Sequence, residues 1–250
     1  MRLRLIRNAA LVLDYGGVRF LIDPDLAPRH ARESFTGRSR NPMVDLPIPA
    51  AGAGKDVDVV LVSHLHEDHF DRTETLDHAL PLLCQPGDDD AIRAEGFTQV
   101  EVVSDATVVS GVAIRRTGGR HGLGEVGEWM EAVSGFVFEA EAEPTLYWAG
   151  DTVLCDEVRA VLAREQPDVV VTHSCGASWP DSNDEPVLIV MDAAQTIECC
   201  GLVDVVVATH MEALDHATVS RAELRLAATG SGVGEGRLRI PLDGETLEFT

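Results

Sequence analysis

The sequence has very little lysine. Lys55 is the only lysine among 20 basic residues, against 42 Asp and Glu, and the formal net charge at pH 7 is -22. Proteins that bind nucleic acids or anionic membranes use Lys and Arg to neutralise phosphates. The composition therefore predicts no nucleic-acid or membrane partner and favours a small-molecule substrate. An anionic substrate stays open, because bound divalent cations reverse the local sign of charge.

Cysteines arranged as a disulfide framework are also absent. The five cysteines are an odd number without framework spacing, which is typical of reduced thiols. No apolar run is long enough to cross a bilayer. The amino terminus lacks the uninterrupted apolar stretch and cleavage site of a secretory signal. The sequence thus predicts a cytoplasmic protein and leaves a homo-oligomer open.

No linker rich in Pro, Gly or Ser divides the 250 residues, and no Gly-x-Ser-x-Gly motif is present. A content of 45% hydrophobic residues is enough for a sizeable core without disulfides. We therefore expect one domain over residues 1–250, and we do not expect a serine nucleophile of the α/β-hydrolase type.

Periodic segments alternate between strand and helix patterns. Residues 11–23 predict a hairpin that turns at Gly16-Gly17, and the β-branched run 57–63 predicts a strand buried on both faces. Further strands are expected near 100–103, 112–117, 134–138, 145–149, 168–172 and 204–209. Helices are expected over 73–82, after Asp88, from Asp156, before Gly201 and from Ser220. A terminal hairpin is expected to turn at Asp243-Gly244.

Two segments have no periodicity, residues 24–55 and 175–190. Unstructured segments of this length within a domain are usually functional or disordered. They contain Arg29, His30, Arg38 and Trp179, which are candidates for the lining of a pocket. We expect these two loops to determine substrate specificity.

The run His64-Leu-His66-Glu-Asp68-His69 follows the predicted buried strand directly. A tight turn with this spacing can present four nitrogen and oxygen donors to one side. Imidazole and carboxylate groups suit zinc, manganese or iron. Four such donors within six residues are therefore interpreted as part of a metal site.

Three more candidate donors follow predicted strands elsewhere in the chain. His121 follows strand 112–117, Asp151 follows strand 145–149, and His210 ends strand 204–209. In layered α/β proteins, functional sites collect at the ends of strands. The three residues are therefore expected to join the cluster that begins at His64.

At this point the sequence resembles the metallo-β-lactamase superfamily. SHLHEDHFD matches the HxHxDH motif, AGDT at 149–152 matches the Gly-Asp-Thr turn, and ATH at 208–210 matches the final histidine. LIDPD at 21–25 is similar to the early Asp-Pro turn. The resemblance covers essentially the whole chain and is nearest to predicted hydrolases related to L-ascorbate-6-phosphate lactonase. It implies an α/β fold, a four-layer αββα sandwich of two packed mixed β-sheets flanked by helices.

The resemblance also implies a dinuclear site with two divalent metal ions, zinc or alternatively manganese or iron. The first ion would be bound by His64, His66 and His121, the second by Asp68, His69 and His210, and Asp151 would bridge them. Asp23 would either orient a ligand through a hydrogen bond or act as an ordinary turn-capping carboxylate. The ions would lower the pKa of a shared water to about 7. The implied function is a metal-dependent hydrolase that uses metal-bound hydroxide to cleave a small ester, lactone or phosphoester.

Asp68 and His216 are the candidate catalytic residues. Asp68 would orient the water or accept a proton. His216 would contact the substrate or donate a proton to the leaving group, and the alternative for it is an ordinary histidine of a surface loop. His173 is expected in a pocket or packing role, Cys175 as a small buried or pocket-lining thiol rather than a nucleophile, and Arg120 either as an anion contact or as a solvated side chain. The alternative functions are a phosphodiesterase or nuclease of the same superfamily, a non-hydrolytic metal-binding protein and a di-iron redox protein.

Overall fold

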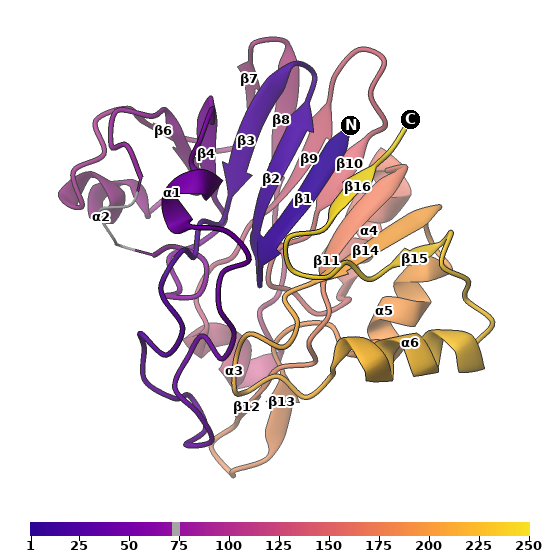
Figure 1. Ribbon diagram of the computed structural model, residues 1–250. Coiled ribbons are helices and arrows are strands. Elements are labelled where there is room, and N and C mark those ends of the chain that lie inside the picture. Colours follow the sequence, from indigo (N-terminus) through magenta and orange to yellow (C-terminus); the bar gives the residue numbers. More distant parts are fainter. Residues whose placement is uncertain (72–75) are drawn as a thin grey trace.

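The structure is a computed structural model that describes residues 1–71 and 76–250 (Figure 1). Its strands form two seven-stranded sheets and one two-stranded sheet. The first sheet has the spatial order β16 (Thr246–Glu248), β1 (Arg2–Arg7), β2 (Ala10–Tyr15), β3 (Val18–Ile22), β4 (Val59–Val62), β5 (Leu82–Cys84), β6 (Val100–Val102). The second has the order β15 (Leu238–Arg239), β14 (Val205–Thr209), β11 (Val169–His173), β10 (Leu146–Trp148), β9 (Gly135–Glu139), β8 (Val112–Thr117), β7 (Ala106–Val109).

The remaining elements are short. Strands β12 (Ser178–Pro180) and β13 (Pro186–Leu188) form the small sheet. The helices of the described ranges are α1 (Ala50–Ala53), α2 (Asp89–Ala94), α3 (Gly124–Trp129), α4 (Asp156–Glu165), α5 (Ala193–Cys200) and α6 (Arg221–Gly230). None of the helices in the described residues has the length and apolar character that crossing a membrane requires.

The two large sheets pack face to face around the main core. This core includes Phe20 and Leu61 from the first sheet and Phe138 and Trp148 from the second. The outer face of the second sheet packs against α4, α5 and α6, and the outer face of the first packs against α1 and α2. The predicted αββα sandwich of two mixed sheets is therefore confirmed.

Several local predictions are confirmed by the packing. Tyr15 pairs with Val18 across the predicted Gly16-Gly17 turn, and every residue of β4 is buried. On α6, the Ser220 side chain accepts from the backbone of Glu223 and the Glu223 side chain accepts from Ser220. This capping box satisfies backbone N–H groups that the first helical turn leaves free.

Three local predictions are wrong. The helix expected over 73–82 is contradicted at 76–81, which forms bends and turns before β5, while 72–75 lie outside the described residues. The expected terminal hairpin does not form, because β15 pairs with β14 and β16 pairs with β1, in different sheets. The second loop contains the hairpin of β12 and β13 rather than irregular chain alone.

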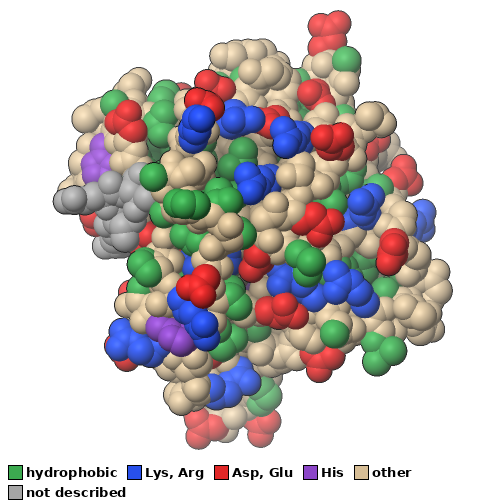
Figure 2. Space-filling model, viewed as in Figure 1, with side chains coloured by type: hydrophobic (Ala, Val, Ile, Leu, Met, Phe, Trp, Pro, Cys, Tyr) green, Lys and Arg blue, Asp and Glu red, His purple; other side chains and the backbone are tan. Residues whose placement is uncertain are grey.

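Parallel pairing brings the site together at one edge of the sandwich. Strands β10, β11 and β14 are neighbours and run parallel, so their carboxyl ends meet. In Figure 1 this edge also carries α3, β12 and β13, whereas both termini lie at the opposite end of the sheets. On the face seen in Figure 2, basic side chains occur in small groups interspersed with acidic ones.

Candidate metal centre

The turn after β4 presents the histidine-rich motif. The backbone N–H groups of His69 and Phe70 both donate to the carbonyl of His66, at 2.9 and 3.1 Å, which closes the chain into a tight turn. Phe70 is buried in the core between the first sheet and its helices. His64, Asp68 and His69 are also buried, and His66 is partly exposed.

The second sheet supplies the other donors. Asp151 follows β10, His173 ends β11, and His210 follows β14. A glycine is needed before Asp151, because Gly150 has φ +71° and an added Cβ would lie 2.6 Å from the carbonyl oxygen of Ser134. His210 itself has φ 62°, a left-handed conformation that is uncommon for a non-glycine residue. The surrounding structure therefore imposes the direction in which His210 points.

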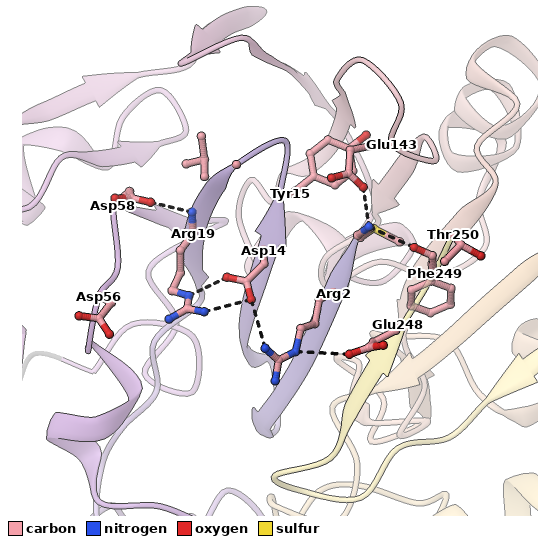
Figure 3. Close-up of a pocket in the computed structure, with 13 residues that line it drawn as sticks. Arg2, Asp14, Tyr15, Arg19, Asp56, Asp58, Glu143, Glu248, Phe249 and Thr250 are labelled. Carbon is pink, nitrogen blue, oxygen red and sulfur yellow. Dashed lines mark hydrogen bonds and ion pairs between the residues drawn. The ribbon is translucent and has the colours of Figure 1, made fainter.

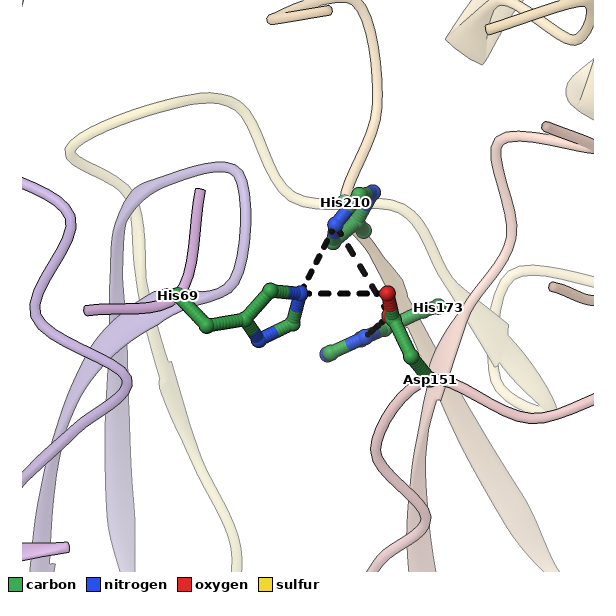
Figure 4. A group of neighbouring side chains, drawn as sticks. All are labelled: His69, Asp151, His173 and His210. Atoms are coloured by element: carbon green, nitrogen blue, oxygen red, sulfur yellow. Dashed lines mark hydrogen bonds and ion pairs between the residues drawn. The ribbon is translucent and has the colours of Figure 1, made fainter. Parts of the chain in front are cut away.

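The candidate ligands form two groups. In one, donor atoms of His64, His66 and His121 lie within 4.8 Å of one another. In the other, the same holds for the residues of Figure 4, namely His69, Asp151, His173 and His210.

Asp151 is in contact with both groups. Its Oδ2 lies 3.2 Å from Nε2 of His69, 3.5 Å from Nε2 of His121 and 3.9 Å from Nε2 of His64. These distances place a carboxylate between the two sets of imidazoles. This position is compatible with the bridging role that the family resemblance implies for Asp151.

Asp68 lies beside the second group. Its Oδ2 is 3.0 Å from Nε2 of His210 and 3.6 Å from Nε2 of His69. Asn8 supports this turn by donating to the backbone carbonyl of Asp68 at 3.2 Å. The seven predicted metal ligands therefore all lie at one edge of the sandwich.

Hydrogen bonds on the outer side orient four of the imidazoles. Asp23 Oδ2 accepts from His69 Nδ1 at 2.9 Å and from the hydroxyl of Ser63 at 2.7 Å, and the same hydroxyl lies 3.0 Å from His64 Nδ1. His121 Nδ1 donates to the carbonyl of Ile189 at 2.7 Å. Such outer partners fix the tautomer and leave Nε2 available for a metal. The hydrogen bond predicted for Asp23 is thus present.

The fourth oriented imidazole has a thiol as its partner. Sγ of Cys175 lies 3.4 Å from Nδ1 of His210, and the Cys175 side chain is fully buried. The interpretation of Cys175 as a small buried thiol agrees with this position. Its contact with a candidate ligand is an additional feature that the sequence does not indicate.

The carboxylate of Asp151 is ionised. Burial raises the pKa of Asp151, but the surrounding histidines, His69 foremost, hold it well below its usual value. Burial lowers the pKa of His69, while the carboxylates of Asp151 and Asp68 raise it to about 10. Similarly, the pKa of His210 is raised well above its usual value, since Asp151 outweighs burial. Protons held by this pair of histidines balance carboxylates that cations would otherwise neutralise.

This donor set fits divalent cations. Nitrogen and carboxylate donors converge, as zinc, manganese and iron sites require. Nε2 of His64 is buried and has no hydrogen-bond partner among the described residues, which is costly unless another group satisfies it. The pKa of His64 is held well below its usual value, mainly by burial, so the ring is neutral and able to coordinate.

Residues 18–217 match the family model of the beta-lactamase superfamily domain. The chain belongs to the beta-lactamase superfamily. UPF0173 protein YddR of Bacillus subtilis is 34% identical over the full length of both chains. These matches confirm the resemblance drawn from the motifs.

Solved structures in this superfamily agree closely with the chain. A possible metal-dependent hydrolase from Veillonella parvula is 31% identical, with a TM-score of 0.93 over 99% of this chain and 98% of that one. An isothiocyanate hydrolase from Delia radicum gut bacteria is 35% identical, with a TM-score of 0.90 over 100% and 99%. The chain is a metal-dependent hydrolase of the metallo-β-lactamase superfamily with a His/Asp cluster that could bind metal.

The candidate metal centre opens into a pocket of about 390 Å³. Its floor includes His66, Asp68, His121 and Asp151, and its walls are largely apolar or aromatic. The wall residues are Phe35, Leu65, Glu67, Trp129, Met130, Trp179, Ile189 and His216. Trp179 lies in the pocket wall as the sequence predicts. The other three candidates from the first loop, Arg29, His30 and Arg38, are not part of the lining.

His216 is placed in this wall near the candidate metal ligands. Burial lowers its pKa below the usual value, although the charge of Asp68 partly opposes this. The imidazole is therefore neutral at pH 7. It can accept a proton there before it donates one.

Arg120 does not enter the pocket lining. Its guanidinium forms an ion pair with Glu157 at 2.7 Å on the surface. Of the two roles that the sequence leaves open, the solvated arginine agrees with this position.

The packing role expected for His173 is compatible with its position against Trp148, and the structure adds a contact with a candidate ligand. The residue is fully buried, and its Nδ1 lies 2.5 Å from Oδ1 of Asp151 inside the second group (Figure 4). The available signal for this contact was its position at the end of the strand between those that lead to Asp151 and His210. Phe35 and Trp129 were missed, because neither belongs to a motif.

A second hollow, of about 620 Å³, lies at the opposite end of the sheets, beside the termini (Figure 3). Its charged groups are paired with one another. Asp14 accepts from Arg19 at 2.6 Å, and the amino terminus contacts Glu143 at 2.5 Å. No histidine or cysteine lies among the described residues that line it, so it offers no comparable metal chemistry.

Proposed function

We propose that this enzyme hydrolyses a small, uncharged substrate that carries an apolar substituent. The pocket wall is the observation that supports this most strongly. Phe35, Trp129 and Trp179 line it, and none of the described lining residues is Lys or Arg. Aromatic walls contribute large apolar contact areas, whereas anions are usually recognised by Arg or Lys.

Isothiocyanates are the substrate class that we place first. The isothiocyanate hydrolase with 35% identity over the whole chain supports this choice. An isothiocyanate is neutral, has an electrophilic carbon and carries one substituent. Addition of water to that carbon gives a thiocarbamate, R–NH–C(=O)–SH. Its C–N bond then breaks while the S–H proton moves to nitrogen, so the products are R–NH₂ and carbonyl sulfide. Esters and lactones present a similar electrophilic carbon and are the second substrate class. The relation to the lactonase branch stays a prediction.

Phosphoesters and nucleic acids are less favoured. The net charge of -22 repels polyanions, and Arg120 is paired with Glu157 outside the pocket. We propose no nucleic-acid or membrane partner. The cytoplasmic location and the open question of a homo-oligomer stay as predicted from the sequence.

We propose two divalent ions, with zinc first, at the two ligand groups joined by Asp151. When bound, they would supply a water of lowered pKa and polarise the electrophile. Asp68 is ionised, because His69 and His210 outweigh the effect of burial on its pKa, so it accepts a hydrogen bond and orients the water. The neutral His216 accepts a proton and passes it to the departing nitrogen or oxygen.

Turnover by protein of known metal content tests this proposal. The turnover rates of phenethyl isothiocyanate, p-nitrophenyl acetate and bis(p-nitrophenyl) phosphate would be compared. Each would be measured with enzyme that contains zinc, manganese or iron. We expect the isothiocyanate to be turned over fastest and the phosphodiester slowest. Asp151→Asn should abolish turnover, whereas Asp204→Asn, an exposed change before β14, should not. Preference for the phosphodiester would overturn the proposal.

A further inference from the structure

One carboxylate outside the metal centre holds the loop that forms a wall of the pocket. Asp215 is only 1% exposed and lies next to His216. Its side chain accepts hydrogen bonds from several groups of the first loop. These are the backbone N–H of Phe35 at 3.0 Å and of Thr36 at 3.1 Å, the Asn41 amide at 2.9 Å, and the hydroxyls of Ser34 at 2.5 Å and Thr36 at 2.7 Å.

The backbone of the same segment adds further contacts. The N–H of Asp215 donates to the Asn41 side chain at 2.9 Å, and that of Met43 donates to the carbonyl of Ala213 at 2.7 Å. The Arg38 guanidinium donates to the carbonyl of Asp215. The loop is thus attached to the segment that leads from His210 to His216.

The loop has little apolar support of its own. Between Glu33 and Arg40 every residue is partly or fully exposed, and no helix or named strand occurs there. The loop is closed at its base by the bridge between Arg32 and Asn41. Polar contacts with Asp215 therefore supply most of what fixes its conformation.

This anchor determines where Phe35 lies. The Phe35 ring packs edge-on against the His216 ring, with centroids 4.9 Å apart and planes at 86°. Both rings line the pocket. The Asp215 carboxylate therefore fixes Phe35 of the loop against His216, which follows Asp215 in the chain.

We infer that Phe35 is a specificity-determining residue for the apolar substituent and that Asp215 is the residue that positions it. Without the carboxylate, the part of the pocket wall formed by Phe35 loses its fixed place. This inference rests on the proposed function, because it names residues that select the substrate of that site. A role in folding alone would leave substituent preference unchanged.

The test compares four variants with the wild type. Asp215→Asn keeps the shape of the side chain, but its NH₂ group replaces one of the two oxygens that accept hydrogen bonds from the loop. Thr36→Val removes one donor and leaves Asp215 in place. Phe35→Ala removes the wall but retains the anchor. Asp204→Asn is the matched control, because it changes an exposed aspartate outside the pocket.

The first measurement is the rate of trypsin cleavage after Arg38 and Arg40, which needs no turnover. Both arginines lie in the anchored loop. We expect cleavage about tenfold faster in Asp215→Asn, a smaller increase in Thr36→Val, and wild-type rates in Phe35→Ala and Asp204→Asn. Thermal unfolding and zinc content of each variant separate loop release from global unfolding. A wild-type cleavage rate in folded Asp215→Asn would overturn the anchoring role.

The second measurement is the KM for methyl and phenethyl isothiocyanate. We expect Phe35→Ala and Asp215→Asn to raise KM for the phenethyl compound about tenfold and for the methyl compound less than twofold. Equal changes for both compounds would overturn the specificity role.

A binding measurement keeps this inference separate from the proposed function. N-phenyl-1-naphthylamine is an uncharged fluorescent probe, and its Kd should rise about tenfold in the same two variants. If the wild type turns over no isothiocyanate or ester, the proposed function fails. The Kd of the probe still tests whether Phe35 and Asp215 form the binding wall. An unchanged Kd would then overturn the inference.

Discussion

Nδ1 of His69 lies 2.9 Å from a carboxylate oxygen of Asp23, which follows β3, whereas His69 lies in the turn after the neighbouring strand β4. The same carboxylate receives the Ser63 hydroxyl, which in turn lies 3.0 Å from His64 Nδ1. One buried acid thus orients a candidate ligand from each of the two metal groups. Its position depends on β3 and β4 running side by side.

Asp23→Asn should weaken zinc binding about 10–100-fold, because outer partners of ligating histidines have effects of this size. Competition with a chromophoric chelator measures the change. Ser63→Ala removes only the hydroxyl that links Asp23 to His64, so its effect should be smaller. Equal affinity in the wild type and Asp23→Asn would show that the orientation does not matter for binding.

Zinc binding to the metal-free protein at pH 7.5 should release protons. The carboxylates around His69 raise its pKa to about 10, and they also raise that of His210, so this pair of rings holds bound protons before coordination. A metal must displace those protons. Calorimetry in buffers of different ionisation enthalpy should therefore give about one to two protons released per chain. Heats that do not depend on the buffer would contradict this charge state.

Gly150→Ala should destabilise the fold by about 2 kcal/mol or more, because it combines a left-handed φ with a backbone clash. Gly87→Ala is the matched control, since Gly87 has φ +97° but nothing lies within 4 Å of the added Cβ. The free energy of unfolding in urea measures both. An equal loss of unfolding free energy in the two variants would mean that the contact with Ser134 is relieved without cost.

The contribution of Asp215 to stability should depend on pH. Burial raises the pKa of its carboxyl, but hydrogen bonds from Ser34, Thr36 and Asn41 lower it well below its usual range. A depressed pKa in the folded state stabilises the protein above the unfolded pKa of about 4, and this stabilisation is lost as the pH falls further. The difference in unfolding free energy between wild type and Asp215→Asn should be constant from pH 7 to 5 and shrink below pH 4. A constant difference down to pH 3 would contradict this.

Local patterns predicted the elements that depend on local interactions. The turn at Gly16-Gly17 and the capping box at Ser220 involve residues close in sequence, and both are present. The turn signal at Asp243-Gly244 is also local, but it does not say which sheet receives each flanking strand. β15 and β16 join different sheets because their pairing partners are distant in sequence.

The site was predictable to the extent that its donors belong to motifs. His64 to His69, Asp151 and His210 belong to motifs, and the structure brings them together with His121. His173 and Phe35 belong to no motif. Their roles depend on which strand lies between two others and on where Asp215 holds a loop, which are properties of tertiary structure. The extent of the single domain over residues 1–250 stays a prediction.

Restoring activity to metal-free protein tests the central claim most directly. Chelator-treated enzyme would be titrated with zinc, and phenethyl isothiocyanate turnover measured at each addition. A centre of two ligand groups joined by Asp151 predicts negligible turnover without metal and a rise that stops at about two equivalents per chain. Turnover that survives metal removal, or that reaches its maximum at one equivalent, would contradict the account.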